Sequence, residues 1–356
     1  MATGGAYASA KMTTPKIAAV ATATPPYWYD QAAVLRMAGY GDAQRSGFFA
    51  NSQIEGRYLY FDPATFKPDE TPRETVDQLA DRFRRGAIEL SSAAVRTVVE
   101  RAGWKLTDVD FIATTTCTGR LCPSLDAHLV NGLGMRPDVQ RVHVGDTGCA
   151  SAMVALQQAW NHLRAFPRHR AVVMAVELCS AAYYLDDRLE SAVAHAIFAD
   201  GAGAVALSGD GAGPAIVEHK TLFRPEHLDA MGFEYPGGRP RVILSKEVRR
   251  IGGGMMKEMA ELLMTSHGLK KDDVRHFVLH SAGRRVIEQA RALLDLRDAE
   301  IAHSRHVLRA FGNMSSATIL FVLEEALRSG EPAPGDWGLM IALGPGFAAE
   351  GALLRW

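Results

Sequence analysis

The chain alternates strand-like and helix-like segments, and its second half repeats the order of the first. VDFIATTTCTG at 109–119 is a strand and a polar turn, as is VRHFVLHSAG at 274–283. GCASAMVALQQAW at 148–160 is a turn and a helix, as is GNMSSATILFVLEEAL at 312–327. Alternation of this kind favours an α/β fold. The internal repeat predicts two related halves that share one interface.

The chain divides into three parts on this pattern. Residues 1–15 are small and polar, and we expect a flexible tail there. The first half is predicted to span 16–215 and the second half 216–356. Each half delivers a polar turn beyond a strand end, where α/β sheets place their ligand sites.

A long helix is predicted within 71–104. Thr71 suits the N-cap, Pro72 the first helical position, and Glu74 would complete a capping box. One apolar helical face is marked by positions 76, 79, 83, 87, 90, 94 and 98. By contrast, GAGAVA at 201–206 precedes a strand rather than a helix, which excludes a dinucleotide loop and favours a packing role for its glycines.

Charge and composition exclude several classes of protein. The formal net charge is −1, so we expect no binding of nucleic acid. No run of about 20 apolar residues occurs, so we expect a cytoplasmic protein without a membrane span. The four cysteines are too few for a disulfide framework, and free thiols are predicted. No metal-ligand spacing is present, and no metal site is predicted.

Cys149 follows a strand-like run and precedes a helix. The dipole and free N–H groups of a helix N-terminus favour a thiolate and lower the pKa of a thiol. A buried structural cysteine is the competing interpretation, and the local sequence leaves the two evenly balanced. Gly148-Cys149 and Gly312-Asn313 occupy the same place in the two halves, which favours a functional role for both turns.

His280 and Asn313 complete a possible catalytic set. His280 closes the strand HFVLH, and an imidazolium there could stabilise a thiolate, although His280 taken alone fits a hydrogen-bonded core histidine better. Asn313 could donate hydrogen bonds to an oxyanion without adding charge. Together with Cys149 they suit acyl-thioester exchange, followed by decarboxylative carbon–carbon bond formation in which His280 and Asn313 hold the enolate.

The chain resembles the type III polyketide synthases, chalcone synthase-like members of the thiolase superfamily, from about Lys16 to Trp356. The motifs that carry the resemblance are GDTGCASA, FADGAGA, LHSAGRRVI, GNMSSA and LGPGFAAE. Several of its segments look most like bacterial members that build their product from malonyl units. The resemblance implies a thiolase-like α/β fold in which two duplicated βαβαβαββ halves form a layered αβαβα core.

The resemblance also implies roles for individual residues. Cys149, His280 and Asn313 match the catalytic triad, and Phe198 matches a gatekeeping phenylalanine. The remaining substrate-pocket positions are Cys117, Thr118, Cys122, Ala182, Val242 and Ser315. Ala182 and Val242 are smaller than their counterparts in plant members, so a roomier cavity is expected. The basic residues expected at coenzyme A are sparse, leaving Arg285 and Arg45.

The implied substrates are malonyl-CoA and an acyl-CoA starter, with no cofactor beyond these coenzyme A thioesters. The match of Cys122 to a residue that reaches into the neighbouring cavity implies a homodimer. An acyl carrier protein stays open as the donor. Alternative functions are a priming synthase like ketoacyl carrier-protein synthase III, which LGPGF and GNMSSA disfavour, and a non-catalytic scaffold, which the filled triad disfavours.

Overall fold

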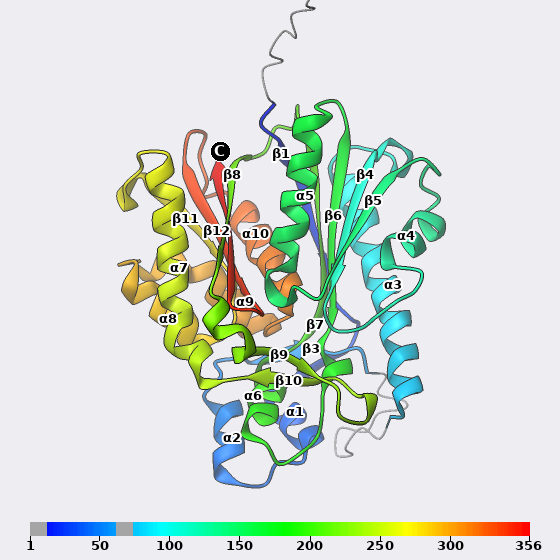
Figure 1. Cartoon of the computed structure of the whole chain (residues 1–356), viewed down its shortest axis with the longest axis vertical. Coiled ribbons are helices and arrows are strands. Elements are labelled where there is room, and N and C mark those ends of the chain that lie inside the picture. The colour runs from blue at the N-terminus through cyan, green and yellow to red at the C-terminus, as the bar shows by residue number, and fades with distance from the viewer. Residues whose placement is uncertain (1–12, 62–73) are drawn as a thin grey trace, which may run out of the picture.

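The computed structural model describes residues 13–61 and 74–356, and its centre is a mixed nine-stranded sheet (Figure 1). The strand order is β11-β12-β13-β8-β1-β7-β6-β4-β5. The first half supplies β1 (Lys16–Ala23), β4 (Phe111–Thr116), β5 (Gln140–Gly145), β6 (Arg170–Leu178) and β7 (Asp200–Ser208). The second supplies β8 (Ala215–Phe223), β11 (Val274–Leu279), β12 (Trp337–Gly344) and β13 (Ala348–Arg355). The two sets meet at a single pair, Lys16 with Ala215.

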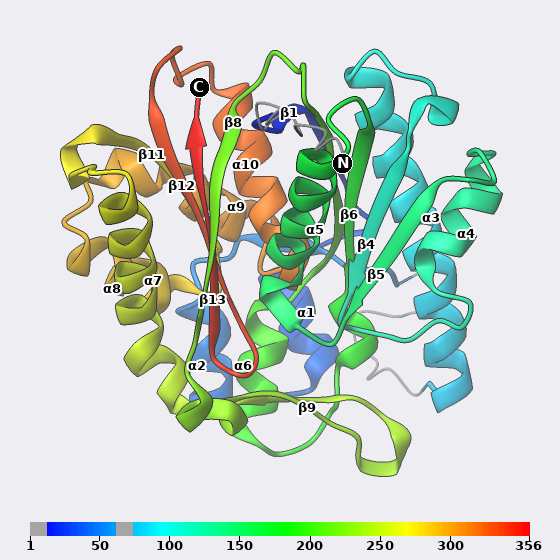
Figure 2. The same ribbon diagram turned by 45° about the horizontal axis from the view of Figure 1, so that its top comes forward.

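Helices cover both sets of strands and fill the space between them. The central layer holds α5 (Ser151–Ala165) and α10 (Thr318–Arg328), which pack on strands of both halves (Figure 2). The outer layers are α3 (Val76–Arg101) with α4 (Leu125–Leu133), and α7 (Lys246–Ser266) with α8 (Arg284–Leu293). The predicted αβαβα order is therefore confirmed. The predicted boundary at 215 and 216 falls at the first residues of β8.

The repeat is less regular in the second half than the sequence suggested. In the first half β5 leads to the Cys149 turn, whereas α9 (Ala302–Phe311) leads to the Asn313 turn in the second. Asn313 makes only an isolated parallel bridge, to Phe198. Because that bridge joins the two halves, it places the Asn313 turn beside a residue of the first half.

Helix α3 begins later than predicted. Its N-cap is Thr75, whose side chain accepts a hydrogen bond from the backbone N–H of Gln78 in a capping box. Thr71 and Pro72 lie outside the described residues, and Glu74 forms an ion pair with Arg82 at 2.7 Å instead of capping. The predicted apolar face is buried except at its first position, where Val76 is 44% exposed.

The glycines of GAGAVA serve packing, as predicted. A Cβ on Gly201 would lie 2.5 Å from the sulfur of Met314, and one on Gly203 would lie 2.7 Å from Cβ of Leu320. These glycines allow α10 to approach β7 closely. Strand β7 therefore packs directly against α10, the helix that follows the Asn313 turn.

The shorter elements gather at one end of the sheet (Figure 1). They are α1 (Gln31–Ala38), α2 (Ala43–Ala50), α6 (Leu189–Ile197), the pair β2 (Trp28–Asp30) with β3 (Gly56–Tyr58), and the pair β9 (Met231–Glu234) with β10 (Arg241–Leu244). The parallel strands β4 and β5 end there, as β11 does, so these elements cover the polar turns.

Within the described residues, no helix is both long and apolar enough to cross a membrane.

Candidate active site

Cys149 and Asn313 lie in counterpart turns that each begin with a glycine. Gly148 has φ of +58° and Gly312 has φ of +75°, a region that glycine adopts without steric cost. A Cβ on Gly148 would lie only 2.1 Å from Cδ of Pro345. Each turn leads into a central helix, α5 or α10. The predicted correspondence of the two turns is confirmed.

Ser315 joins the two turns. Its hydroxyl lies 3.2 Å from the sulfur of Cys149 and 3.2 Å from the sulfur of Cys117. Its φ of +48° is left-handed, a conformation that costs a residue with a side chain about 1–3 kcal/mol and that clusters at functional sites. The strained backbone thus aims a hydroxyl between two thiols.

The side chain of Asn313 contacts the His280 turn and holds the backbone of Ser315. Its side chain is buried, and Nδ2 donates to the carbonyl of Ala282 at 3.2 Å. Its Oδ1 accepts from the backbone N–H of Ser315 at 2.8 Å. Because an amide nitrogen carries two N–H groups, the second can donate to a substrate oxygen.

His280 is wholly buried just beyond the end of β11, where its backbone N–H donates to Ile341 at 2.9 Å. Among the described residues neither ring nitrogen has a hydrogen-bond partner. Buried polar groups without partners are rare, and a catalytic role is one of their explanations. The structure shows no hydrogen bond between His280 and Cys149 within its described part. Such bonds often tighten only when substrate binds.

The pKa values of this pair shift in the direction opposite to the sequence-based expectation. Burial raises the pKa of Cys149 to about 11, against the opposing effect of its hydrogen bond with Ser315. Burial lowers the pKa of His280 to about 4. Withdrawal from water penalises both charged forms and outweighs the helix N-terminus. A neutral thiol and a neutral imidazole therefore prevail near pH 7.

The rate at which iodoacetamide alkylates Cys149 is expected to rise about tenfold per pH unit between pH 6 and pH 9, because only the thiolate reacts. Mass spectrometry of the peptide that contains Cys149 separates its reaction from that of the other cysteines. A rate independent of pH in this range would contradict the neutral pair. It would show instead that a thiolate–imidazolium pair forms in solution.

One pocket gathers most of the predicted substrate-pocket residues beside Cys149. They are Phe198, Cys117, Thr118, Ala182, Val242 and Ser315. Cys122 is exposed and does not line this pocket. His280 and Asn313 lie outside its lining.

The pocket is narrow in this conformation, and a cavity roomier than that of plant members because of Ala182 and Val242 stays a prediction. Its open volume is about 40 Å³, whereas one water needs roughly 10–15 Å³. Met231, Phe233 and Tyr183 are among the other side chains that line it. A growing acyl chain therefore needs some of the side chains that line the pocket to move.

Glu177 is a buried polar residue beside the site that the sequence analysis missed. Its carboxylate accepts hydrogen bonds from Thr118 Oγ1 at 2.8 Å, from the backbone N–H of Cys117 at 3.0 Å, and from Ser316 Oγ. Burial raises its pKa against these hydrogen bonds. An acidic residue inside the apolar strand AVVMAVEL was the signal that could have identified it.

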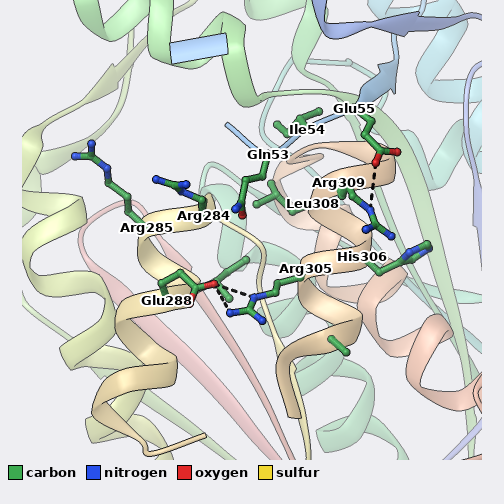
Figure 3. Close-up of a pocket in the computed structure, with 12 residues that line it drawn as sticks. Gln53, Ile54, Glu55, Arg284, Arg285, Glu288, Arg305, His306, Leu308 and Arg309 are labelled. Atoms are coloured by element: carbon green, nitrogen blue, oxygen red, sulfur yellow. Dashed lines mark hydrogen bonds and ion pairs between the residues drawn. The ribbon is translucent and has the colours of Figure 1, made fainter. Parts of the chain in front are cut away.

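A separate cleft of about 1120 Å³ opens between α8, α9 and the residues before β3. Figure 3 shows Arg284 and Arg285 at the start of α8, and Arg305 and Arg309 on α9. Arg305 pairs with Glu288 at 2.6 Å. Arg309 pairs with Glu55 at 3.6 Å, whereas Arg284 and Arg285 make no ion pair or side-chain hydrogen bond within the described residues.

The structure does not bring the predicted coenzyme A contacts together. Arg285 lines the cleft, whereas Arg45 lies outside its lining. Arg45 is held by Asp42 at 2.9 Å and by Asp187 at 3.5 Å, so its charge is already compensated.

A thiol, an imidazole and an amide at turns that precede helices in two related halves, within this five-layered core, define a thiolase-like condensing enzyme. A family model described as "FAE1/Type III polyketide synthase-like protein" matches residues 60–227. A second, described as "3-Oxoacyl-[acyl-carrier-protein (ACP)] synthase III C terminal", matches residues 264–356.

Relatives and solved structures resemble the whole chain. The 3,5-dihydroxyphenylacetyl-CoA synthase of Streptomyces toyocaensis is 33% identical over 96% of this chain and 90% of its own length. The 1,3,6,8-tetrahydroxynaphthalene synthase of Streptomyces peucetius subsp. caesius is 31% identical over 96% and 93%. The crystal structure of PKS-I from the brown alga Ectocarpus siliculosus has a TM-score of 0.89 and 29% identity, covering 98% of this chain and all of that one. The chain belongs to the type III polyketide synthases.

Proposed function

We propose that this chain condenses malonyl-CoA repeatedly with an acyl group held on Cys149, and that the product then closes to an aromatic ring or a pyrone. The observation that carries the proposal is the joining of the Cys149 and Asn313 turns through Ser315. Both similar synthases named above have aromatic products in their names, which supports an aromatic product here.

Loading begins with a neutral thiol. The sulfur of Cys149 attacks the carbonyl of an acyl thioester, the bond to coenzyme A breaks, and the enzyme thioester forms. The thiol proton passes to the neutral imidazole of His280, which then protonates the departing coenzyme A sulfur. Phe198, which lines the pocket beside Cys149, separates the bound acyl group from the entrance.

Extension follows by loss of carbon dioxide from malonyl-CoA. The electron pair of the broken carbon–carbon bond forms an enolate, whose oxygen accepts hydrogen bonds from Asn313 and His280. The enolate carbon attacks the acyl carbonyl, and the thiolate of Cys149 leaves. The chain, two carbons longer, is then carried by coenzyme A and can be loaded again.

The cleft between α8 and α9 is the proposed contact for the phosphates of coenzyme A. Arg284 and Arg285 occupy the first turn of α8, where the helix dipole disfavours cations. The first turn contains no acidic residue, and Gly283 provides no side-chain cap. An anionic phosphate would satisfy both the free N–H groups and the arginines.

Replacing both Arg284 and Arg285 by alanine is expected to raise the KM for malonyl-CoA about 10- to 100-fold, because charge-assisted hydrogen bonds are lost. The kcat should stay close to the original, and so should the KM for malonyl-pantetheine, which lacks the nucleotide. The matched control is the double variant Arg96→Ala with Arg168→Ala, which removes the same two positive charges from exposed positions on α3 and on the loop before β6. Equal losses with both thioesters would contradict the assignment.

A homodimer and a cytoplasmic location are also proposed. The exposed position of Cys122 is compatible with contact to a second copy, and sedimentation at the 38.6 kDa mass of one chain would rule the dimer out. The donor is proposed to be coenzyme A rather than an acyl carrier protein. Higher activity with malonyl carrier protein than with malonyl-CoA would favour a priming synthase instead. This comparison is needed because residues 264–356 match the carrier-protein synthase III model.

The direct test is incubation of the purified protein with malonyl-CoA alone and then with a panel of acyl-CoA starters. Mass spectrometry of the products would give the starter and the number of extensions. The proposal expects products that contain two or more malonyl-derived units. Release of carbon dioxide without any carbon–carbon bond formation would refute it.

A further inference from the structure

Arg57 belongs to β3, and its side chain is completely buried against the carboxyl end of α6. Its Nη1 donates to the carbonyls of His195 and Phe198, both at 2.9 Å. Its Nη2 donates to the carbonyl of Ala196 at 2.7 Å and to the side chain of Gln31. One guanidinium therefore binds three of the carbonyls that end this helix.

These contacts suit an arginine in particular. The last carbonyls of a helix lack partners within the helix and carry partial negative charge. A planar guanidinium presents several N–H groups in a fixed fork, whereas a lysine ammonium is a point charge. Arg57 makes no ion pair within the described residues, and a buried cation without one is costly. An apolar side chain would take these donors away from the buried carbonyls, so the guanidinium is what holds the end of α6.

The end of α6 is continuous with the active site. Phe198, which lines the pocket, is the first residue after the helix. Its carbonyl accepts both from Arg57 and from the hydroxyl of Tyr183 at 2.7 Å. Its main chain is thus held from two sides.

The same segment holds the backbone of Asn313. The N–H of Asn313 donates to the carbonyl of Ile197 at 2.8 Å, and the N–H of Ala199 donates to the carbonyl of Asn313 at 2.8 Å. These two hydrogen bonds are the contacts between the halves at this point. A displacement of 195–199 would consequently shift both Phe198 and Asn313.

We propose that Arg57 is a positioning residue that fixes Phe198 and Asn313 relative to Cys149 by holding the carboxyl end of α6. The inference rests on the proposed function for the roles of Phe198 and Asn313. It adds a residue that does not touch the reacting atoms but sets the geometry of two residues that do.

The test compares Arg57→Lys with Arg101→Lys. Arg101 ends α3 and also binds a main-chain carbonyl, that of Val20 at 2.6 Å, together with Glu324, so it controls for general loss of a guanidinium. In Arg57→Lys, decarboxylation of malonyl-CoA is expected to fall about 10- to 100-fold, as expected for misplaced catalytic groups. Alkylation of Cys149 should change less than about twofold, because the Cys149 turn belongs to another segment. Arg101→Lys should retain the original ratio of the two rates.

Hydrogen exchange tests the geometry independently of activity. The amides of Ala199 and Asn313 are expected to exchange faster in Arg57→Lys than in Arg101→Lys when the two are compared at equal thermal stability. Unchanged exchange together with an unchanged ratio of decarboxylation to alkylation would overturn the proposal. If the wild type formed no polyketide, the exchange result would still decide the positioning role.

If Arg57→Lys does not fold, a milder variant still tests the proposal. Gln31 Nε2 donates to the carbonyl of Ala196 at 2.8 Å, so Gln31→Met removes one donor from the same helix end. It should change exchange and decarboxylation in the same direction as Arg57→Lys but by a smaller factor. A Gln31→Met variant that exchanges and decarboxylates as the original does would also count against the proposal.

Discussion

A Cys149→Ala variant is expected to form no condensation product from malonyl-CoA with any starter. The acyl chain has to leave coenzyme A before the enolate attacks, and the thiol of Cys149 is the nucleophile that receives it. The measurement is product formation from labelled malonyl-CoA, followed by chromatography and mass spectrometry. The expected loss is complete rather than partial because no acyl-enzyme forms.

The same variant provides its own control. Decarboxylation of malonyl-CoA depends on Asn313 and His280, so Cys149→Ala should still release carbon dioxide, which would show that the site remains folded. Condensation at the original rate in Cys149→Ala would refute the mechanism. Cys117, whose sulfur shares the Ser315 hydroxyl, would then be the next nucleophile to replace.

An Asn313→Ala variant is expected to lose about 100- to 1,000-fold in malonyl-CoA decarboxylation, the usual cost of one oxyanion donor. Acylation of Cys149 should be far less affected, because the thiol and His280 remain. Stopped-flow release of carbon dioxide measures the first reaction, and mass spectrometry of the acylated protein measures the second.

Asn313→Asp is the matched comparison for this prediction. It keeps the acceptor for the backbone N–H of Ser315 but removes the amide donor, so decarboxylation should fall as in Asn313→Ala while the turn is retained. Equal losses of loading and decarboxylation in both variants would indicate that Asn313 supports only the fold. Retained decarboxylation in either variant would contradict its assigned role.

Local patterns predicted the elements well where the determinants are close in sequence. The apolar spacing of α3 identified its buried face, but its start was placed too early, since Thr75 rather than Thr71 made the cap. From the sequence alone, two N-cap candidates a few residues apart fit the start of a helix equally well. The choice between them depends on which N–H groups each side chain reaches.

The pKa of Cys149 illustrates a different kind of error. The helix N-terminus was visible in the sequence, and its dipole favours a thiolate. Burial is a property of the whole fold, and it raises the pKa to about 11 instead. The width of the pocket also depends on segments far apart in the sequence, because Phe233 and Met231 come from β9.

The sequence by itself determined the duplicated α/β architecture and the places of Cys149, His280 and Asn313, because strand ends, glycine turns and helix starts are encoded by neighbouring residues. Only the tertiary structure decided what surrounds them. Ser315 meets Cys149 across 166 positions, and Arg57 meets His195 across 138. Such contacts, and the desolvation that accompanies them, arise only when distant segments are packed together, so no local pattern can record them.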